Sequence, residues 1–321
     1  MAKPLRYRGR AMKLSYRKRR DQALKKFSET DILNILTTVT IRSGIPLVYK
    51  IGRPCRIKKA YLIAFILDRR LMGSVYEQME TESSLYLGMH YDHSAFHYHY
   101  SRLSPAVFLR LTNQFCNMIC NLLQDLILLH IFDSTALSTS VREERTVQGL
   151  RKKERLTQKF HTLLGYDPPN QIVVVEAMLA TDHHTSDNQG ALRMMRIDLR
   201  GYAFGDTAYE TYDLIEATEN AGLVPVYKPS KKPLGRPLTP KGRRRNLWDG
   251  NPNRLYKEIR GTGEVLYGAA TRCGLIRTES KREENRLKDA LLIGLRQNLL
   301  TYIRLKALSR IIRKTRLHRY L

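Results

Sequence analysis

Apolar positions in the first third of the chain recur at the spacing of an α-helix, and polar residues that begin helices stand just before them. Ser28 followed by Asp31 matches a capping box, and Asp92 stands before an aromatic-rich segment. Ser104 followed by Pro105 is typical of a helix start. The pattern predicts a helical region over residues 28–122, with helices within SETDILNILTTV, RIKKAYLIAFILDRR, DHSAFHYHYSRL and SPAVFLRLTNQFCNMICNLL.

Beyond residue 122 the pattern changes to short apolar runs and to strict alternation, which favour strands. Helical periodicity returns between these runs and near the end of the chain, so an α/β layer architecture is expected over residues 123–315. The predicted strands are LILLHIF (126–132), KFHTLLGY (159–166), NQIVVVEAML (170–179), GYAFGD (201–206) and LVPVYKPS (223–230), and the predicted helices lie at 207–222, 255–272 and 281–314.

The net charge of the chain indicates the class of molecule that it binds. The chain of 321 residues has 56 Lys and Arg against 30 Asp and Glu, a formal net charge of +26. This excess is larger than solubility requires and indicates a polyanion, most often nucleic acid. Residues 1–27 form a basic arm, which we expect to stay disordered until it meets phosphates. Residues 228–254 form a basic loop whose expected DNA contacts are Lys231, Lys232, Arg243, Arg244 and Arg245.

Other classes of protein are not favoured. No apolar run approaches the ~20 residues of a membrane span, and the basic N-terminus has no apolar signal region, so a cytoplasmic protein is expected. Cys116 and Cys120 are four residues apart on a predicted helix, and the sequence offers no second pair to complete a zinc site. Reduced thiols are the expected state.

Two aspartates carry the candidate chemistry. Asp133 and Asp206 each end an apolar strand, and each is followed by a hydroxyl residue, Ser134 or Thr207. Functional groups collect at the carboxyl ends of strands in open α/β sheets. A carboxylate there without a basic neighbour is costly unless it binds a cation, so a divalent metal site is predicted. The alternative is that each aspartate caps the following helix.

A third carboxylate is needed to hold two metal ions across one phosphate. In YKEIRGTGEVLY, Tyr256, Arg260 and Glu264 are spaced as on one helix face, which leaves Arg260 available for a phosphate. The alternative is a surface ion pair between Arg260 and Glu264. The other acidic candidates in this part of the chain are Glu258, Glu279, Glu283 and Glu284.

Taken in order, several segments resemble the DDE transposases of prokaryotic insertion sequences, over roughly residues 50–305. They are GRPCRIKKAYLIAFIL, DHSAFHYHYSRL, IFDSTAL, KFHTLLGY with NQIVVVEAMLATDHHTSDN, GDTAYET, YKEIRGTGEVLY and LKDALLIGLRQNLL. The resemblance implies a ribonuclease-H-like catalytic core with an N-terminal helical DNA-binding domain and C-terminal helices. It assigns Asp133, Asp206 and Glu264 as the catalytic and metal-binding triad for two Mg²⁺ ions, with Mn²⁺ as a substitute.

The same resemblance implies cleavage of double-stranded DNA at the element ends and strand transfer into target DNA by a dimer, in a nucleoid-associated protein. Arg260 and Arg272 are then expected to contact DNA. The family often has a lysine seven residues after the glutamate, where this chain has Thr271 beside Arg272. Two alternatives stay open: a catalytically decayed transposase that only binds DNA, and a metal-dependent nuclease without strand transfer.

Overall fold

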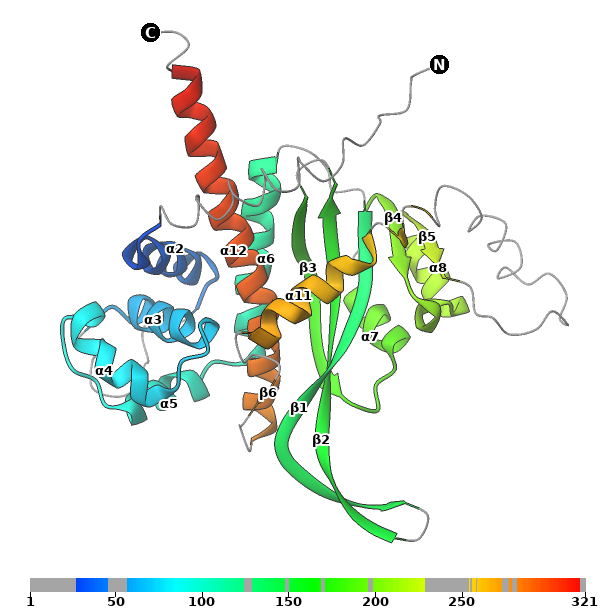
Figure 1. The fold of residues 1–321 in the computed structure, drawn as a ribbon, viewed down its shortest axis with the longest axis horizontal. Coiled ribbons are helices and arrows are strands. Elements are labelled where there is room, and N and C mark those ends of the chain that lie inside the picture. The colour runs from blue at the N-terminus through cyan, green and yellow to red at the C-terminus, as the bar shows by residue number, and fades with distance from the viewer. Residues whose placement is uncertain are drawn as a thin grey trace, which may run out of the picture.

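The structure is a computed structural model that describes residues 27–45, 57–123, 129–147, 150–168, 171–195, 199–228, 254, 256–257, 259–272, 277–278 and 282–317. Helices come first, then a sheet with interleaved helices, then two further helices (Figure 1). The elements are α2 (Glu29–Arg42), α3 (Lys59–Leu71), α4 (Tyr76–Leu87), α5 (His93–Ser101), α6 (Pro105–Leu123), β1 (Leu129–Val147), β2 (Leu150–Asp167), β3 (Ile172–Asp182), α7 (Asp187–Met194), β4 (Gly201–Gly205), the 3₁₀ turn η1 (Thr207–Tyr209), α8 (Tyr212–Asn220), β5 (Leu223–Tyr227), α11 (Gly261–Arg272), β6 (Arg277–Thr278) and α12 (Glu283–Leu317).

The helix starts follow the polar residues that the sequence offers. The Ser28 hydroxyl accepts from the Asp31 N–H at 3.1 Å, and the Asp31 carboxylate accepts from the Ser28 N–H at 3.1 Å, so the predicted capping box is confirmed. The Asp92 carboxylate accepts from the Ser94 N–H at 2.8 Å at the start of α5. Helix α6 begins at Pro105, as predicted.

The strands form one mixed sheet in the order β3-β2-β1-β4-β5, and β6 pairs with β1. The first three strands are antiparallel, whereas β4 and β5 run parallel to β1 and are reached through α7 and α8. The expected α/β architecture is confirmed at this level. None of the described helices is both long and apolar enough to cross a membrane.

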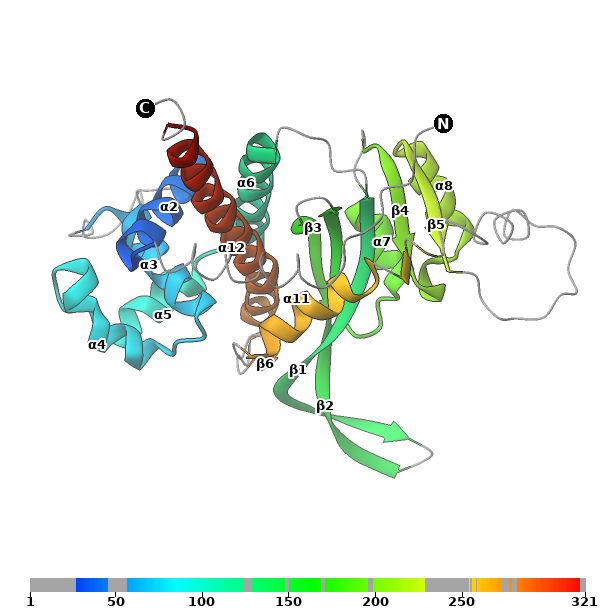
Figure 2. The same cartoon turned by 45° about the horizontal axis from the view of Figure 1, so that its top comes forward.

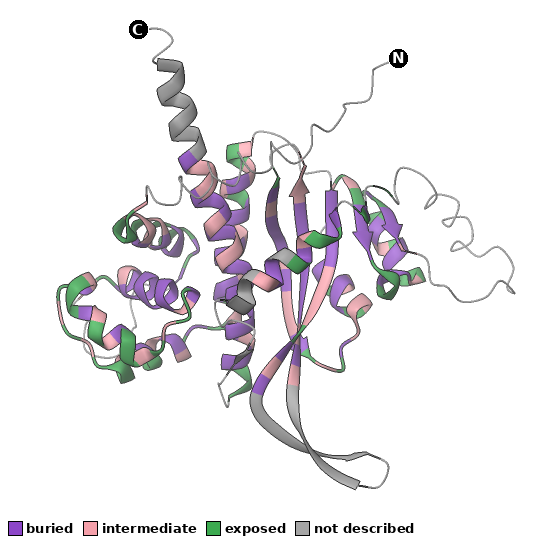
Figure 3. Cartoon of the chain, in the orientation of Figure 1, coloured by how far each residue is buried: buried purple, intermediate pink, exposed green. Residues whose placement is uncertain are grey.

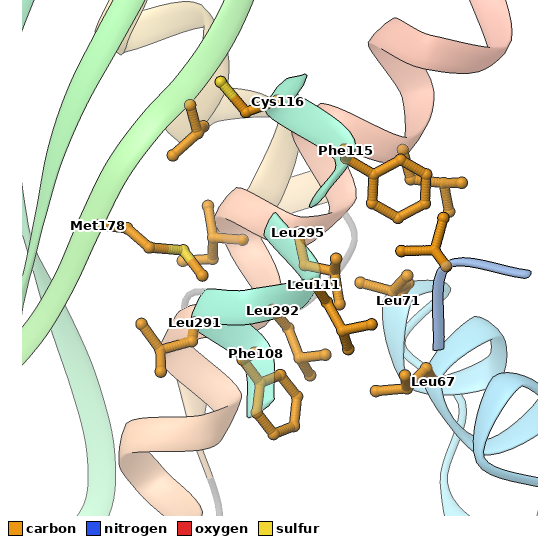
Figure 4. Close-up of a cluster of buried hydrophobic side chains, with 14 of the residues drawn as sticks. Leu67, Leu71, Phe108, Leu111, Phe115, Cys116, Met178, Leu291, Leu292 and Leu295 are labelled. Carbon is orange, nitrogen blue, oxygen red and sulfur yellow. The ribbon is translucent and has the colours of Figure 1, made fainter. Parts of the chain in front are cut away.

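Helices cover both faces of the sheet. Helices α6, α11 and α12 lie on one face, α7 and α8 lie on the other, and α2 to α5 pack outside α6 and α12 (Figures 1 and 2). One apolar core joins α2 to α6, α11 and α12 to the sheet, and a second joins α7 and α8 to it. The buried positions of α6, α12 and the strands are shown in Figure 3. Figure 4 shows this core, in which side chains of α3, α6, β3 and α12 converge: Leu67, Leu71, Phe108, Leu111, Phe115, Met178, Leu291, Leu292 and Leu295. Each contributes about 1.5–3 kcal/mol through burial, so α6 ties the helical region to the sheet.

A buried asparagine fixes α12 against the edge strand. Asn298 Nδ2 donates to the backbone carbonyls of Val175 at 2.8 Å and Thr112 at 3.1 Å, and its Oδ1 accepts from the Val175 N–H at 2.7 Å. The pairing of β2 with β3 changes register beside Val175, between Leu163 and Leu164. The side chain therefore satisfies backbone groups at an irregular point of the sheet.

Three elements differ from the sequence-based expectation. Strand β1 runs on from Phe132 to Val147 because β2 pairs with it along this length, as a long ribbon. Helix α7 forms between the third and fourth strands, where no helix was predicted. The helix expected over residues 255–272 is interrupted at Arg260, and α11 begins at Gly261.

Candidate active site

Strand pairing brings the two aspartates to one edge of the sheet. In the parallel pair β1 and β4, Ile131 lies opposite Phe204. Two residues further along each strand stand Asp133 and Asp206, at the carboxyl end of β4. Asp206 therefore follows the end of its strand, as the sequence predicts, at the sheet edge where functional groups of α/β proteins collect. Asp133 lies level with it but within β1, which continues to Val147, so the prediction that Asp133 ends its strand is wrong.

Helix α11 brings Glu264 to the same edge, and a glycine makes its approach possible. An added Cβ at Gly263 would lie 1.6 Å from Oδ2 of Asp133, so no side chain fits between the helix and this carboxylate. Gly261, two residues earlier, has open space around it. The first turn of α11 thus lies directly on Asp133 and leaves Glu264 exposed. The two glycines of the motif differ in role, and Gly263 is the one that close packing requires.

Burial and like charge both act on Asp133. Burial raises the pKa of Asp133 from 3.8 to about 6, and the negative charges of Asp206, Glu264 and Asp187 push it in the same direction. The Ser134 N–H, which donates to Oδ1 at 2.9 Å, acts against this rise in pKa. Within the described part of the chain, no lysine or arginine pairs with Asp133, Asp206 or Glu264. The three carboxylates therefore form a negatively charged cluster without a protein counter-ion among these residues.

Asp206 also caps the turn that follows it. Its Oδ1 accepts from the Ala208 N–H at 2.8 Å at the start of η1, and the side chain is exposed. The alternative prediction, that Asp206 caps the element after its strand, is thus correct for Oδ1 of this residue. A carboxylate has two oxygens with several lone pairs, so capping and metal binding are compatible.

Tyr256 and Arg260 lie beside the cluster, although not on one continuous helix. Burial raises the pKa of Tyr256, the charges of Asp206 and Asp133 raise it further, and the charge of Arg260 lowers it. The Arg260 N–H donates to the Tyr256 carbonyl at 2.8 Å, and the Arg260 side chain is exposed. The alternative ion pair with Glu264 is not formed among the described residues. Arg260 is therefore accessible to a phosphate near the carboxylates.

The other predicted DNA contacts are not placed by the structure. Arg272 is the last residue of α11. The basic arm over residues 1–26 and the loop over residues 229–253 lie outside the described residues, and with them Lys231, Lys232, Arg243, Arg244 and Arg245.

Three residues beside Asp133 were not singled out as parts of one site. Asp187, in the first turn of α7, accepts from the Ser134 hydroxyl at 2.7 Å and from Lys159 Nζ at 3.1 Å. The sequence places Asp187 in a polar cluster typical of a turn, and nothing there indicates its contact with β1. The sequence did offer one signal of this contact, because Lys159 is a charged residue at the start of the mostly apolar strand KFHTLLGY. Asp187 and Lys159 thus form a polar layer on the sheet face opposite α11.

The donor set fits hard divalent cations. Carboxylate oxygens are the ligands that Mg²⁺ and Mn²⁺ prefer. Among the described residues, one group of three already has ligand atoms within 4.8 Å of one another, namely Glu80, Asp92 and His93 on α4 and α5. Its members are joined by the hydrogen bond of His93 Nδ1 with Glu80 at 2.9 Å. The ligand atoms of Asp133, Asp206 and Glu264 do not all lie within that distance of one another.

Comparisons with known proteins do not identify the chain. No family model matches the sequence, and no curated protein matches it significantly.

Proposed function

We propose that this protein is a DDE transposase with a ribonuclease-H-like core, which cleaves DNA at the ends of an insertion sequence and transfers the cut strand into target DNA. One observation carries the proposal. Asp133, Asp206 and Glu264, which are 73 and 58 residues apart in sequence, lie near the carboxyl end of β4, close enough for the charges of Asp206 and Glu264 to raise the pKa of Asp133, without a basic partner in the described part of the chain. Uncompensated clusters of this kind are costly and are typical of functional sites.

The residues present fit the metal ions that the chemistry needs. Asp133, Asp206 and Glu264 would hold two Mg²⁺ ions, which supply a polarised nucleophile and stabilise the attacking and leaving oxygens of the phosphate. Asp133 is held in place by the Ser134 N–H and by the close approach of Gly263. Arg260, exposed beside Tyr256, would bind a phosphate of the DNA strand and orient it toward the carboxylates.

Charge supports DNA as the substrate. The formal net charge of +26 favours binding to the phosphates of DNA, whereas the carboxylate cluster is locally negative. DNA would therefore be held by surrounding basic residues and would approach the carboxylates only with divalent cations between them. Cleavage is expected to require Mg²⁺ or Mn²⁺, whereas DNA binding is expected to persist in a chelator.

The test is an in vitro reaction on a plasmid that carries the DNA flanking this gene on both sides. Wild type is compared with Glu264→Gln, and with Glu216→Gln as a control for loss of one exposed negative charge on α8. We expect Mg²⁺-dependent nicks at the flanking ends and joined products with wild type and the control, and neither with Glu264→Gln.

Each other outcome has a distinct meaning. Nicks without joined products would favour the nuclease, and DNA binding without nicks would favour the decayed transposase. Activity of Glu264→Gln equal to that of wild type would refute the assignment of the triad.

A further inference from the structure

Strands β1 and β2 continue beyond the sheet as a two-stranded ribbon (Figures 1 and 2). Pairing of β2 with β3 ends at Gln158, and pairing of β1 with β6 involves only Ser138 and Thr139. Residues 142–147 and 150–155, termed here the distal ribbon, pair with each other and with no other described strand. An isolated two-stranded ribbon is only marginally stable in water, so we expect a projection of this length to be stabilised by contact with another molecule.

The pairing register distributes the charged residues of the distal ribbon unequally between its two faces. Directly opposed residues share a face, and successive pairs alternate between the two faces. One face carries the pairs Arg142–Arg155, Glu144–Lys153 and Thr146–Arg151, and the other carries Glu143–Glu154 and Arg145–Lys152. The first face has four basic residues and one acidic residue, 4 − 1 = +3, and the second has two of each, 2 − 2 = 0. All of the net charge is therefore on one face, termed here the basic face.

The register also opposes like charges. Arg142 lies opposite Arg155 on the basic face, whereas Glu143 lies opposite Glu154 and Arg145 lies opposite Lys152 on the other face. Like charges directly opposed across two strands are destabilising. A polyanion on the basic face would offset the unfavourable Arg142–Arg155 pairing, and the acidic and basic pairs of the other face leave that face neutral overall.

The position of the ribbon relates it to the carboxylate cluster. Strand β1 leaves the sheet in the direction in which β4 ends, so the distal ribbon projects from the edge that holds Asp133 and Asp206. Arg142 is nine residues beyond Asp133, which corresponds to ~30 Å along an extended strand. That distance is close to the ~34 Å of one turn of duplex DNA, whose major groove admits a two-stranded ribbon.

We propose that the distal ribbon is a DNA-binding arm, whose basic face contacts the phosphates of the duplex about one helical turn from the phosphate at the carboxylate cluster. This proposal rests on the proposed function, because it takes DNA as the substrate. The contact is electrostatic, so it positions the duplex and carries no sequence information of its own.

The ribbon offers its own matched control. Arg142→Gln with Arg155→Gln removes one opposed basic pair from the basic face, and Arg145→Gln with Lys152→Gln removes one such pair from the other face. Both double variants lower the net charge by two and replace one pair of basic residues at opposed register positions. Their affinities for a duplex of about four helical turns (~40 base pairs) are measured against salt concentration, in a chelator. Thermal unfolding of both is measured as a check on folding.

We expect the basic-face variant to bind at least about tenfold more weakly than wild type, with a salt slope smaller by about 1.8 if both residues contact phosphates. The control variant is expected to stay within about twofold of wild type, because its face is neutral overall. Equal losses in the two variants would overturn the ribbon proposal and show only an effect of net charge. A changed oligomeric state of the basic-face variant in light scattering, with DNA affinity unaltered, would also overturn it in favour of a subunit contact.

Failure of the proposed function looks different. If wild type bound no duplex, both proposals would fall. If wild type bound and cut DNA while both double variants matched it, the ribbon proposal alone would be wrong.

Discussion

Neutralising Asp133 is expected to stabilise the fold while it abolishes cleavage. Asp133→Asn removes one negative charge from the cluster of Asp133, Asp206 and Glu264 and keeps an oxygen that can accept from the Ser134 N–H. The substitution therefore removes the cost of a buried, repelled carboxylate with little change in shape. Most substitutions in a folded protein destabilise it, so an increase in stability is a discriminating result.

The magnitude follows from the pKa of Asp133. Its rise from 3.8 to about 6 means that folding disfavours the ionised form by about 3 kcal/mol at neutral pH. That value is a ceiling for the gain, because asparagine still has to be desolvated. At roughly 2 °C per kcal/mol for a large domain, the unfolding midpoint should rise by roughly 5 °C.

The pH dependence has a definite sign. The folded-state pKa of Asp133 is above its unfolded value, so between pH 6 and 3.8 the folded protein binds more protons than the unfolded one. The contribution of Asp133 to stability should therefore rise as pH falls from 7 through 6, and this rise should be complete near pH 4. Burial also raises the pKa of Asp68 to about 6, with the same sign in both proteins. The difference between wild type and Asp133→Asn isolates the effect of Asp133 and should vanish at low pH.

The assay is thermal unfolding in a chelator at several pH values between 4.5 and 7.5, chosen to bracket the pKa of about 6. Glu216→Gln serves as the control for loss of one exposed negative charge. Addition of Mg²⁺ at pH 7.5 should stabilise wild type by mass action and should stabilise Asp133→Asn less. A variant that is less stable than wild type at pH 7.5 in chelator, or a difference that does not shrink at low pH, would refute the electrostatic account of this site.

Three further outcomes follow from other contacts. Gly263→Ala should strongly reduce cleavage, because its Cβ would lie 1.6 Å from Oδ2 of Asp133. Gly261→Ala should be tolerated, because the space around Gly261 is open, and a plasmid-nicking assay compares the two variants. Asp206→Asn should keep the cap of η1 and lose cleavage, so retained activity would show that capping is its whole role. Asp289→Asn should cost about 1.5–3 kcal/mol in denaturant unfolding, because it leaves partly buried Arg70 without the carboxylate now 2.8 Å away.

Features that depend on residues close together in sequence could be predicted from local sequence signals. The capping box of Ser28 and the start of α6 at Pro105 were both predicted because their hydrogen bonds and backbone preferences are local. Asp206 was predicted to follow a strand end for the same reason, since an apolar run that stops at an aspartate is visible in sequence. The same signal was wrong for Asp133, because pairing with β2 carries β1 on to Val147. That the two aspartates lie side by side depended on parallel pairing of β1 and β4, which the alternation of helices and strands favoured.

The missed features depend on residues distant in sequence. Asp187 contacts Ser134 and Lys159 only because α7 packs against β1 and β2, and its surroundings in sequence are those of an ordinary turn. The length of the ribbon was missed because most of its residues are charged and they show no alternation of apolar and polar positions. The start of α11 at Gly261 was also missed. The periodicity of apolar positions does not show where a helix is interrupted, and here the interruption lies at Arg260.

A cluster of mutually repelling carboxylates has to be held together by contacts outside it. For α11 these contacts come directly after the acid: Leu266 and Tyr267 are buried against the sheet, and the Tyr267 hydroxyl lies 2.9 Å from Thr162 Oγ1 on β2. Thr162 lies opposite Asp133 in the pairing of β1 with β2, so one hydrogen bond ties the helix of Glu264 to the strand beside Asp133. Burial of two such side chains contributes about 1.5–3 kcal/mol each, enough to offset the ~3 kcal/mol cost of ionising Asp133. These core residues of α11 therefore set the separation of the carboxylates, and with it the spacing of any ions that the carboxylates share.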